Sequence, residues 1–349
     1  MELSAKRFES PSQPFCEIEV LRTATENVSR NRAKKGFADS LRSMVTDENG
    51  RRYIEVLRLL QELRATSDIS EHKKLLKTVD PEIFNLDPGF LLDEFVPALH
   101  ELKVRLFCMD HDCADIYQLM FITKTEGNDN FFGNGPFGAS GLMNPAEKQR
   151  LTKIAEDAAR PGFKIMEIGS AAGWGSTPIL ASIAKANNGE MWCVDIFEHP
   201  KNYVRTVFDF SLKYFGTSDF VHVLQGTSRE KAQMFEDGYF DLIFIDGDHS
   251  YKGLSTDLEC WESKVHGGGT LCGHDSVGYA KDFPSDQLKA RMNIEASGPL
   301  TWVRNGKTEE VRVHAGVIAA LHERYGRDFD LDPQYKEKPV RSVWSRIAR

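Results

Sequence analysis

The spacing of apolar residues changes near residue 144. Before that point the clearest pattern is helical, because residues 50–65 place apolar side chains on one helical face. These positions are Ile54, Leu57, Leu60 and Leu63. A second apolar stretch, residues 88–107, predicts one or two helices, with Pro97 either starting the second or kinking a single long one. The chain before residue 144 is therefore predicted to be mainly helical.

After residue 144, short apolar runs alternate with helical segments. Asn144 can cap a helix whose first residue is Pro145. The apolar runs follow at residues 163–169, 190–197, 220–226, 240–248 and 268–275. Runs of this length between helices are typical of strands buried in a parallel sheet. This part of the chain is therefore predicted to have an α/β fold with helices on both faces of the sheet.

The end of the chain continues the same domain. Residues 312–326 have the pattern of an amphipathic helix, and residues 342–349 are a candidate final strand. Asn305-Gly306 lies between two runs of β-type residues within residues 299–313. That dipeptide predicts a hairpin or an insertion on the substrate side of the domain.

These changes in pattern divide the chain into residues 1–143 and 144–349. The first 35 or so residues are polar without a clear period, and we expect them to form a disordered, solvated arm. Residues 125–142 combine glycine, asparagine and phenylalanine, which predicts a loop rather than a helix. That loop is either a plain connection or a lid over a ligand, since long loops in compact domains are often functional.

Composition and charge restrict which partners the protein can bind and in which cellular compartment we expect it. The 349 residues carry 44 lysines and arginines against 52 aspartates and glutamates, a net charge of −8, which argues against a nucleic-acid partner. No apolar run approaches about 18 residues, so no membrane span is expected. The N-terminus lacks the apolar region of a secretory signal, and the six cysteines suggest no disulfide framework. We therefore expect a cytoplasmic protein with reduced thiols.

Glycines follow the first predicted strand, in the sequence EIGSAAGWGS. Gly169, Gly173 and Gly175 suit a point where the backbone turns sharply and a ligand comes close to it. Their order differs from the dinucleotide fingerprint G-x-G-x-x-G, and the Gly-Lys-Ser/Thr of a phosphate loop is absent from this turn. The turn therefore predicts a ligand without a pyrophosphate.

Two further strand ends point to the same ligand. Asp195 ends the second predicted strand, where a carboxylate can accept hydrogen bonds from both hydroxyls of a ribose. Gly226-Thr227-Ser228 follow the third strand, near the place expected for an adenine ring. Because the carboxyl ends of parallel strands share one edge of the sheet, the three segments are predicted to line one crevice.

In these motifs, and in the sequence from residue 241 to residue 275, the chain resembles the class I S-adenosylmethionine-dependent methyltransferases. The resemblance covers residues 144–349. It implies a Rossmann-like fold with a mostly parallel seven-stranded sheet, an antiparallel last strand and S-adenosylmethionine as cofactor. The residues that would contact the cofactor are Glu167, Gly169, Ser170, Ala171, Gly173, Ser176, Asp195, Ile196, Gly226, Thr227, Ser228 and Asp246.

Acidic and histidine residues gather after the fourth and fifth predicted strands. Asp246, Asp248 and His249 follow the fourth strand, and His274 and Asp275 follow the fifth. Carboxylates and an imidazole can hold Mg²⁺ or another divalent cation, which would lower the pKa of a substrate hydroxyl. A histidine is also suited to act as a general base near neutral pH. The alternative is that the aspartates cap helices and the histidines bond within their own loops.

The resemblance narrows here to metal-dependent O-methyltransferases that act on catechols, caffeoyl esters and macrolide sugars. In the sugar enzymes an Asp-Gly-x-His segment supplies a metal ligand and the base, which implies catalytic roles for Asp246 and His249. Their next strand ends in two adjacent metal ligands, which correspond to His274 and Asp275. The chain departs from the family at this point, because His274 replaces a carboxylate and Ser276 occupies the asparagine position of the catechol enzymes.

The acceptor is left open by the sequence. O-methylation of a hydroxyl on a sugar or other small natural product is the favoured interpretation. The alternatives are a methyltransferase of the same fold acting on nitrogen or on protein, and a catalytically silent scaffold. Nitrogen acceptors commonly go with Asn-Pro-Pro-Tyr or Asp-Pro-Pro-Tyr after the fourth strand, whereas this chain has Asp-Gly-Asp-His. We expect residues 1–143 to cover the acceptor pocket or to form a homodimer.

Overall fold

The protein, as a computed structural model, forms two compact units, residues 1–142 and 143–349. The structure describes residues 13–29, 37, 41, 44–87, 90, 95–111, 113–122, 143–198, 204–304, 306–333 and 342–349. The segment predicted as a loop or lid, residues 125–142, lies outside the described residues. No helix in the described ranges combines the length and the apolar character needed to cross a bilayer.

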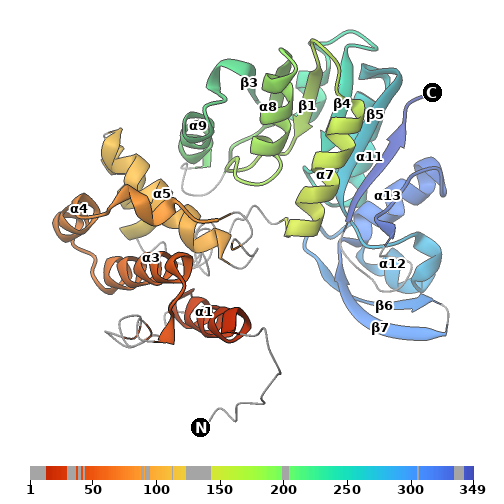
Figure 1. Cartoon of the computed structure of the whole chain (residues 1–349). Coiled ribbons are helices and arrows are strands. Elements are labelled where there is room, and N and C mark those ends of the chain that lie inside the picture. The colour runs from red at the N-terminus through yellow and green to blue at the C-terminus, as the bar shows by residue number, and fades with distance from the viewer. Residues whose placement is uncertain are drawn as a thin grey trace. The chain divides into compact units, whose positions relative to one another are not determined.

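The described part of the first unit is helical, as predicted (Figure 1). Its elements are α1 (Gln13–Ser29), α3 (Glu48–Ala65), α4 (Ile69–Lys77), the short η2 (Pro81–Phe84), α5 (Val96–Asp110), α6 (Ala114–Tyr117) and η3 (Gln118–Ile122). Helix α3 contacts α1, α4 and α5. The predicted apolar face of α3 is fully buried, as the zero exposure of Ile54, Leu57, Leu60 and Leu63 shows.

Helix α1 corrects the expectation of a disordered arm over the first 35 residues. Residues 13–29 form a helix, and its side chains Leu21, Ala24 and Val28 are buried. The Thr25 hydroxyl lies 2.9 Å from the Tyr53 hydroxyl of α3. The apolar positions of α1 are few but fall on one face, so packing against α3 stabilises a helix that its polar composition alone does not predict.

The second unit is a sheet with helices on both faces, as predicted. The main sheet has the order β3-β2-β1-β4-β5-β8, in which only β8 is antiparallel to its neighbour. Its strands are β1 (Lys164–Ile168), β2 (Glu190–Asp195), β3 (Val221–Gln225), β4 (Phe240–Ile245), β5 (Val265–Ser276) and β8 (Ser342–Ile347). Because β1 to β5 are parallel, their carboxyl ends lie at the same edge.

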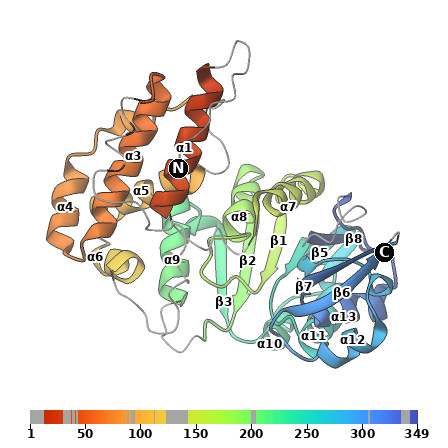
Figure 2. The ribbon, with the colours of Figure 1, turned by 90° about the horizontal axis from the view of Figure 1, so that it is seen from below.

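Helices cover both faces of this sheet. Helices α7 and α8 contact strands on one face, and α10, α11 and α13 contact strands on the other (Figure 2). The helices of this unit are α7 (Pro145–Ala158), α8 (Thr177–Ala186), α9 (Val204–Phe215), α10 (Ser228–Ala232), α11 (Tyr251–Trp261), α12 (Ser285–Arg291) and α13 (Ala315–Tyr325). Short 3₁₀ turns complete it: η4 (Ser218–Phe220), η5 (Glu262–Lys264) and η6 (Ala280–Asp282). As predicted, Asn144 caps α7, in a reciprocal capping box with Glu147.

The sheet has six strands among the described residues, so the expectation of seven strands is wrong. The two runs on either side of Asn305-Gly306 pair with each other as the antiparallel hairpin β6 (Gly298–Arg304) and β7 (Lys307–Val313). Leu300, Trp302 and Val313 of this hairpin join a separate apolar cluster with residues of α12 and α13. The hairpin is therefore a separate two-stranded sheet that packs in its own apolar cluster and does not pair with the main sheet (Figure 2).

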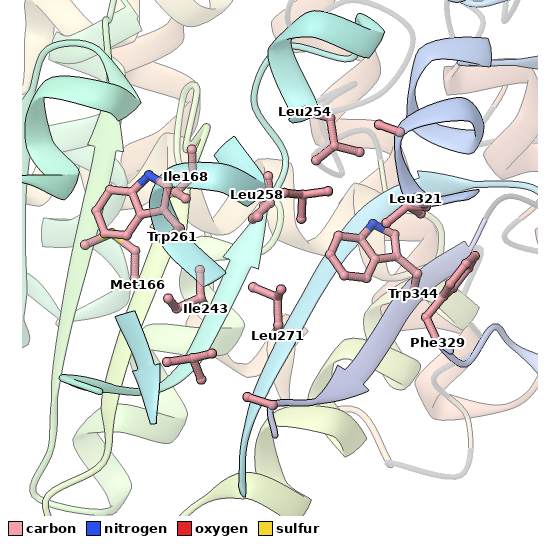
Figure 3. Packing of buried hydrophobic residues seen from close by; sticks show 14 of the residues in the cluster. Met166, Ile168, Ile243, Leu254, Leu258, Trp261, Leu271, Leu321, Phe329 and Trp344 are labelled. Atoms are coloured by element: carbon pink, nitrogen blue, oxygen red, sulfur yellow. The ribbon is translucent and has the colours of Figure 1, made fainter. Parts of the chain in front are cut away.

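The main core lies between the sheet and helices α11 and α13 (Figure 3). Trp261 of α11 and Trp344 of β8 are both fully buried in it. Leu271 of β5 and Leu321 of α13 belong to the same cluster. Trp344 also lies against Gly273 of β5, where a methyl group would come within 2.7 Å of the indole ring. The last strand is therefore fixed to β5 by side-chain packing as well as by its backbone pairing.

Replacing Trp344 with alanine should lower the free energy of unfolding of the second unit by about 3–5 kcal/mol, because a fully buried tryptophan leaves a large cavity. The matched control on the same strand is Ile347→Ala, whose side chain is 61% exposed and should change stability little. Chemical denaturation followed by tryptophan fluorescence and circular dichroism measures both. Equal effects of the two substitutions would contradict this description of the core.

Candidate active site

The glycine turn after β1 lies directly against the residue that follows β4. Gly169 has a left-handed backbone with φ +85°, and a methyl group on it would lie 2.2 Å from the Asp246 carbonyl oxygen. Gly173 is left-handed as well, and a methyl group there would meet the Ser211 hydroxyl at 2.4 Å. Only glycine fits at these two positions. The absence of side chains lets the turn pack closely against the end of β4 and against α9.

Glu167, predicted to contact the cofactor, is fully buried beneath this turn. Its carboxylate accepts hydrogen bonds from the Ser176 hydroxyl at 2.5 Å and the Thr177 hydroxyl at 2.7 Å. Burial raises the pKa of Glu167, and these hydrogen bonds oppose that shift. Glu167 and Ser176 therefore connect β1 to the start of α8 by a hydrogen bond. Ala171, in contrast, is exposed on the outer side of the turn.

Asp195 joins the turn after β1 to the chain after β2. Its Oδ2 accepts the amide hydrogen of Ala171 at 2.8 Å, and its Oδ1 accepts that of Phe197 at 2.7 Å. Each carboxylate oxygen has a further lone pair, and the residue is only partly buried. Ile196 beside it is 46% exposed, which is unusual for a large apolar side chain. At the end of β2, the Asp195 carboxylate and the Ile196 side chain can therefore offer a ligand one polar and one apolar contact.

In the segment after β3, the hydroxyls of Thr227 and Ser228 form hydrogen bonds within the protein. Thr227 caps α10 in a reciprocal capping box with Glu230. Ser228 accepts the indole N–H of Trp261 at 2.7 Å. Gly226, with φ +147°, lies beside the Lys231 side chain, where a methyl group on Gly226 would come within 2.6 Å of Lys231 Cε. Residues 226–228 therefore shape this part of the edge through backbone conformation.

Four predicted residues meet at the carboxyl ends of β4 and β5. His249 Nε2 lies 3.4 Å from Asp246 Oδ1 and 3.0 Å from Asp275 Oδ2. His274 Nδ1 lies 3.6 Å from Asp246 Oδ1 and 3.4 Å from Asp275 Oδ1. His274 and Asp275 lie within β5, just before its last residue Ser276, rather than after the strand. Asp248 is exposed and caps its own loop by accepting the Ser250 amide hydrogen.

The cluster concentrates charge in a buried place. Burial lowers the pKa of His249, but hydrogen bonds and charge from Asp246 and Asp275 outweigh it and raise the pKa to about 10. The pKa of His274 is likewise lowered by burial and raised by these carboxylates to about 10. Burial raises the pKa of Asp275, yet the neighbouring imidazoles hold it well below its usual range. The buried carboxylates are therefore stabilised by positive charge, either on protonated imidazoles or on a bound cation.

Two residues that the sequence analysis did not assign to the site border this cluster. Glu147, predicted only as a first-turn residue of α7, is buried and places Oε2 3.5 Å from His274 Nε2. His314, just before α13, places Nε2 3.5 Å from Asp275 Oδ2, and its ring lies against that of His249 with centroids 4.2 Å apart and the planes tilted by 32°. The hairpin between β5 and α13 separates His314 from the strand ends in sequence, so spacing alone gives no signal for it.

The donor set fits a divalent cation. Ligand atoms of Asp246, His274 and Asp275 all lie within 4.8 Å of one another. Glu147 Oε2 faces the outer nitrogen of His274 at 3.5 Å, the side on which a carboxylate commonly orients a metal-ligating histidine. The residues predicted as metal ligands are therefore close enough together, and correctly supported, to hold Mg²⁺ or another divalent ion.

Comparison with known proteins finds a family match over the segment that contains the glycine turn and the cluster. Residues 166–276 match the family described as "Methyltransferase domain" (Methyltransf_24), a span that runs from β1 through the glycine turn to the end of β5. No curated protein matches the chain.

Solved structures with a similar fold include two methyltransferases. The O-methyltransferase TomG from Streptomyces achromogenes, solved with its methyl donor, is 13% identical over 68% of this chain and 96% of its own, with a TM-score of 0.41. The methyltransferase PaMTH1 from Podospora anserina, bound to S-adenosylhomocysteine, is 18% identical over 61% of this chain and 82% of its own, with a TM-score of 0.39.

The family match covers the segments that carry the sequence motifs, and the sheet has the parallel order with an antiparallel last strand expected for that fold. Residues 166–276, within the second unit, therefore match a methyltransferase domain.

Proposed function

We propose that the protein transfers a methyl group from S-adenosylmethionine to a hydroxyl oxygen of a small molecule. One observation carries the proposal: the glycine turn that suits the donor touches the backbone of Asp246, which begins the acidic and histidine cluster. A donor bound along the turn and an acceptor bound at the cluster would be neighbours. Positioning of this kind supplies much of the acceleration of a group transfer between two bound molecules.

The donor would lie across three strand ends. Its methionine part would run along Gly169 to Gly173, the turn that these two glycines hold close to Asp246 and to α9. The free lone pairs of Asp195 accept the ribose hydroxyls, and the exposed side chain of Ile196 covers the adenine ring. Gly226 borders the ring from β3. The donor thus uses the partly exposed groups of this edge, while Glu167 supports it from below.

His249 is the proposed general base. Its ring is held by Asp246 and Asp275, two carboxylates that fix its orientation through Nε2. The opposite nitrogen, Nδ1, would take the proton of the acceptor hydroxyl while the oxygen attacks the methyl carbon in line with the departing sulfur. Asp246, His274 and Asp275 would hold a divalent cation. When bound, such a cation lowers the pKa of a hydroxyl and offsets the carboxylate charge that keeps His249 protonated.

Hydroxylated small molecules suit this site better than nitrogen acceptors. An oxygen nucleophile needs its proton removed, and the cluster offers imidazoles and carboxylates for that purpose. Methyl transfer to nitrogen or to a protein side chain by the same fold is the second candidate. Product analysis with labelled methyl donor separates the two, because the label is found on oxygen in one case and on nitrogen in the other.

Replacing Asp195 with asparagine should weaken binding of S-adenosylhomocysteine by at least about tenfold, because hydrogen bonds to a charged group contribute about 1.5–3 kcal/mol. Isothermal titration calorimetry gives the affinity directly. Asp219→Asn, at an exposed site beside β3, is the control and should bind like the wild type. Unchanged affinity in the Asp195 variant would remove the ribose contact from the proposal.

Replacing His249 with alanine should lower kcat by about 10²–10⁴-fold, the usual contribution of a general base. The affinity for S-adenosylhomocysteine should stay nearly unchanged, since His249 lies on the acceptor side of the turn. His322→Ala, at an exposed position of α13, serves as the control. A variant with normal turnover, or one that loses donor affinity instead, would be inconsistent with the assigned role.

Removing divalent cations with a chelator should depress methyl transfer, and added Mg²⁺ or Mn²⁺ should restore it. Donor binding, measured in parallel by calorimetry, should persist because the turn after β1 takes no part in the cation site. Full activity after exhaustive chelation would show that the cluster works without a cation.

A further inference from the structure

A second group of ligand atoms lies beside the first. We propose that His249, Asp275 and His314 form another divalent-cation position, which takes a transition ion such as Zn²⁺ and shares Asp275 with the position at Asp246 and His274. The ligand atoms of these three residues lie within 4.8 Å of one another. The inference concerns cation binding alone, so it stands whether or not the acceptor is a hydroxyl.

The distances around Asp275 Oδ2 fit metal coordination. His249 Nε2 lies 3.0 Å from this oxygen, and His314 Nε2 lies 3.5 Å from it. Ligands bound at about 2.1 Å from one ion stand about 3.0 Å apart at right angles and about 3.4 Å apart in a tetrahedron. Each of the two histidine nitrogens is therefore spaced from Asp275 Oδ2 as one edge of a coordination sphere requires.

His314 is oriented as a ligand. Its Nδ1 lies 2.7 Å from the Glu295 carbonyl oxygen, which can only accept, so Nδ1 carries the hydrogen. In the neutral ring this leaves the lone pair on Nε2, the atom that faces Asp275 Oδ2. In that form two acceptor atoms face each other, and either a proton on Nε2 or a cation between them removes the repulsion. A backbone carbonyl that fixes the outer nitrogen is also the common support of a metal-ligating histidine.

Asp275 is placed to serve both positions. Its Oδ1 faces His274 Nδ1 at 3.4 Å, and its Oδ2 faces His249 and His314. The residue has a left-handed backbone with φ +63°, a conformation that costs free energy in a non-glycine residue and marks functional positions. This strained backbone near the end of β5 sets the two carboxylate oxygens toward two different groups of ligands.

The donor types favour different ions at the two positions. Two imidazoles and one carboxylate suit zinc and the other late first-row ions, whereas Mg²⁺ prefers oxygen ligands and retained water. The position at Asp246, His274 and Asp275 offers two carboxylates and one imidazole, so more of its ligands are oxygen atoms. A cation at the His314 position would take the Nε2 lone pair of His249 and leave Nδ1 protonated. The ring could not then accept a proton, so occupancy of this position would compete with the base role.

Zinc stoichiometry tests the proposal. Metal-free full-length protein is dialysed against Zn²⁺, and bound metal per chain is measured by mass spectrometry of the elements. The wild type should bind two ions. His314→Ala should bind one and keep the first position, His274→Ala should bind one and keep the second, and Asp275→Ala should lose both. His322→Ala, with its exposed side chain on α13, should bind two like the wild type.

Circular dichroism and binding of S-adenosylhomocysteine check that each variant is folded. One zinc ion in the wild type, or two in folded His314→Ala, would overturn the second position. If methyl transfer to oxygen is refuted while His314→Ala loses one ion, the proposed function fails and this inference stands. Two ions in the wild type and one in His314→Ala, with normal donor binding in both, support it.

Discussion

The close approach of Gly169 to Asp246 is the contact on which the candidate site depends. Strands β1 and β4 are neighbours, and the Asp246 amide donates to the Ile168 carbonyl at 2.7 Å. No side chain fits between the two segments. Because of this contact, the turn suited to the methyl donor and the groups suited to the acceptor lie next to each other at one edge of the sheet, without any long loop to position them.

The second constraint is charge. Asp246, Asp275 and Glu147 are carboxylates in a largely buried place, and imidazoles surround them. Buried carboxylates need compensation by protonated rings or by a cation, and loss of one partner leaves an uncompensated charge. Protonated histidines and bound cations are therefore alternative ways to satisfy the same cluster. This links the cation sites to the protonation of His249, the group proposed to act as base.

The sequence predicted most of the fold because parallel strands leave a clear signal, and it predicted the four residues at the ends of β4 and β5 because each follows or ends such a strand. It also predicted the hairpin at Asn305-Gly306, whereas the family resemblance wrongly implied a seventh strand. His314 could not be found by spacing, because the hairpin and α12 intervene before the chain returns to the site. Helix α1 had a weak signal in Leu21, Ala24 and Val28, whose spacing places them on one helical face.

Methyl transfer to oxygen is the central claim, and its most direct measurement is product analysis. The purified protein is incubated with donor carrying an isotopically labelled methyl group and a panel of hydroxylated metabolites, and products are identified by mass spectrometry. The account predicts a product that gains one labelled methyl group on an oxygen atom. Label found only on nitrogen, or no transfer by protein that binds the donor under the same conditions, would contradict it.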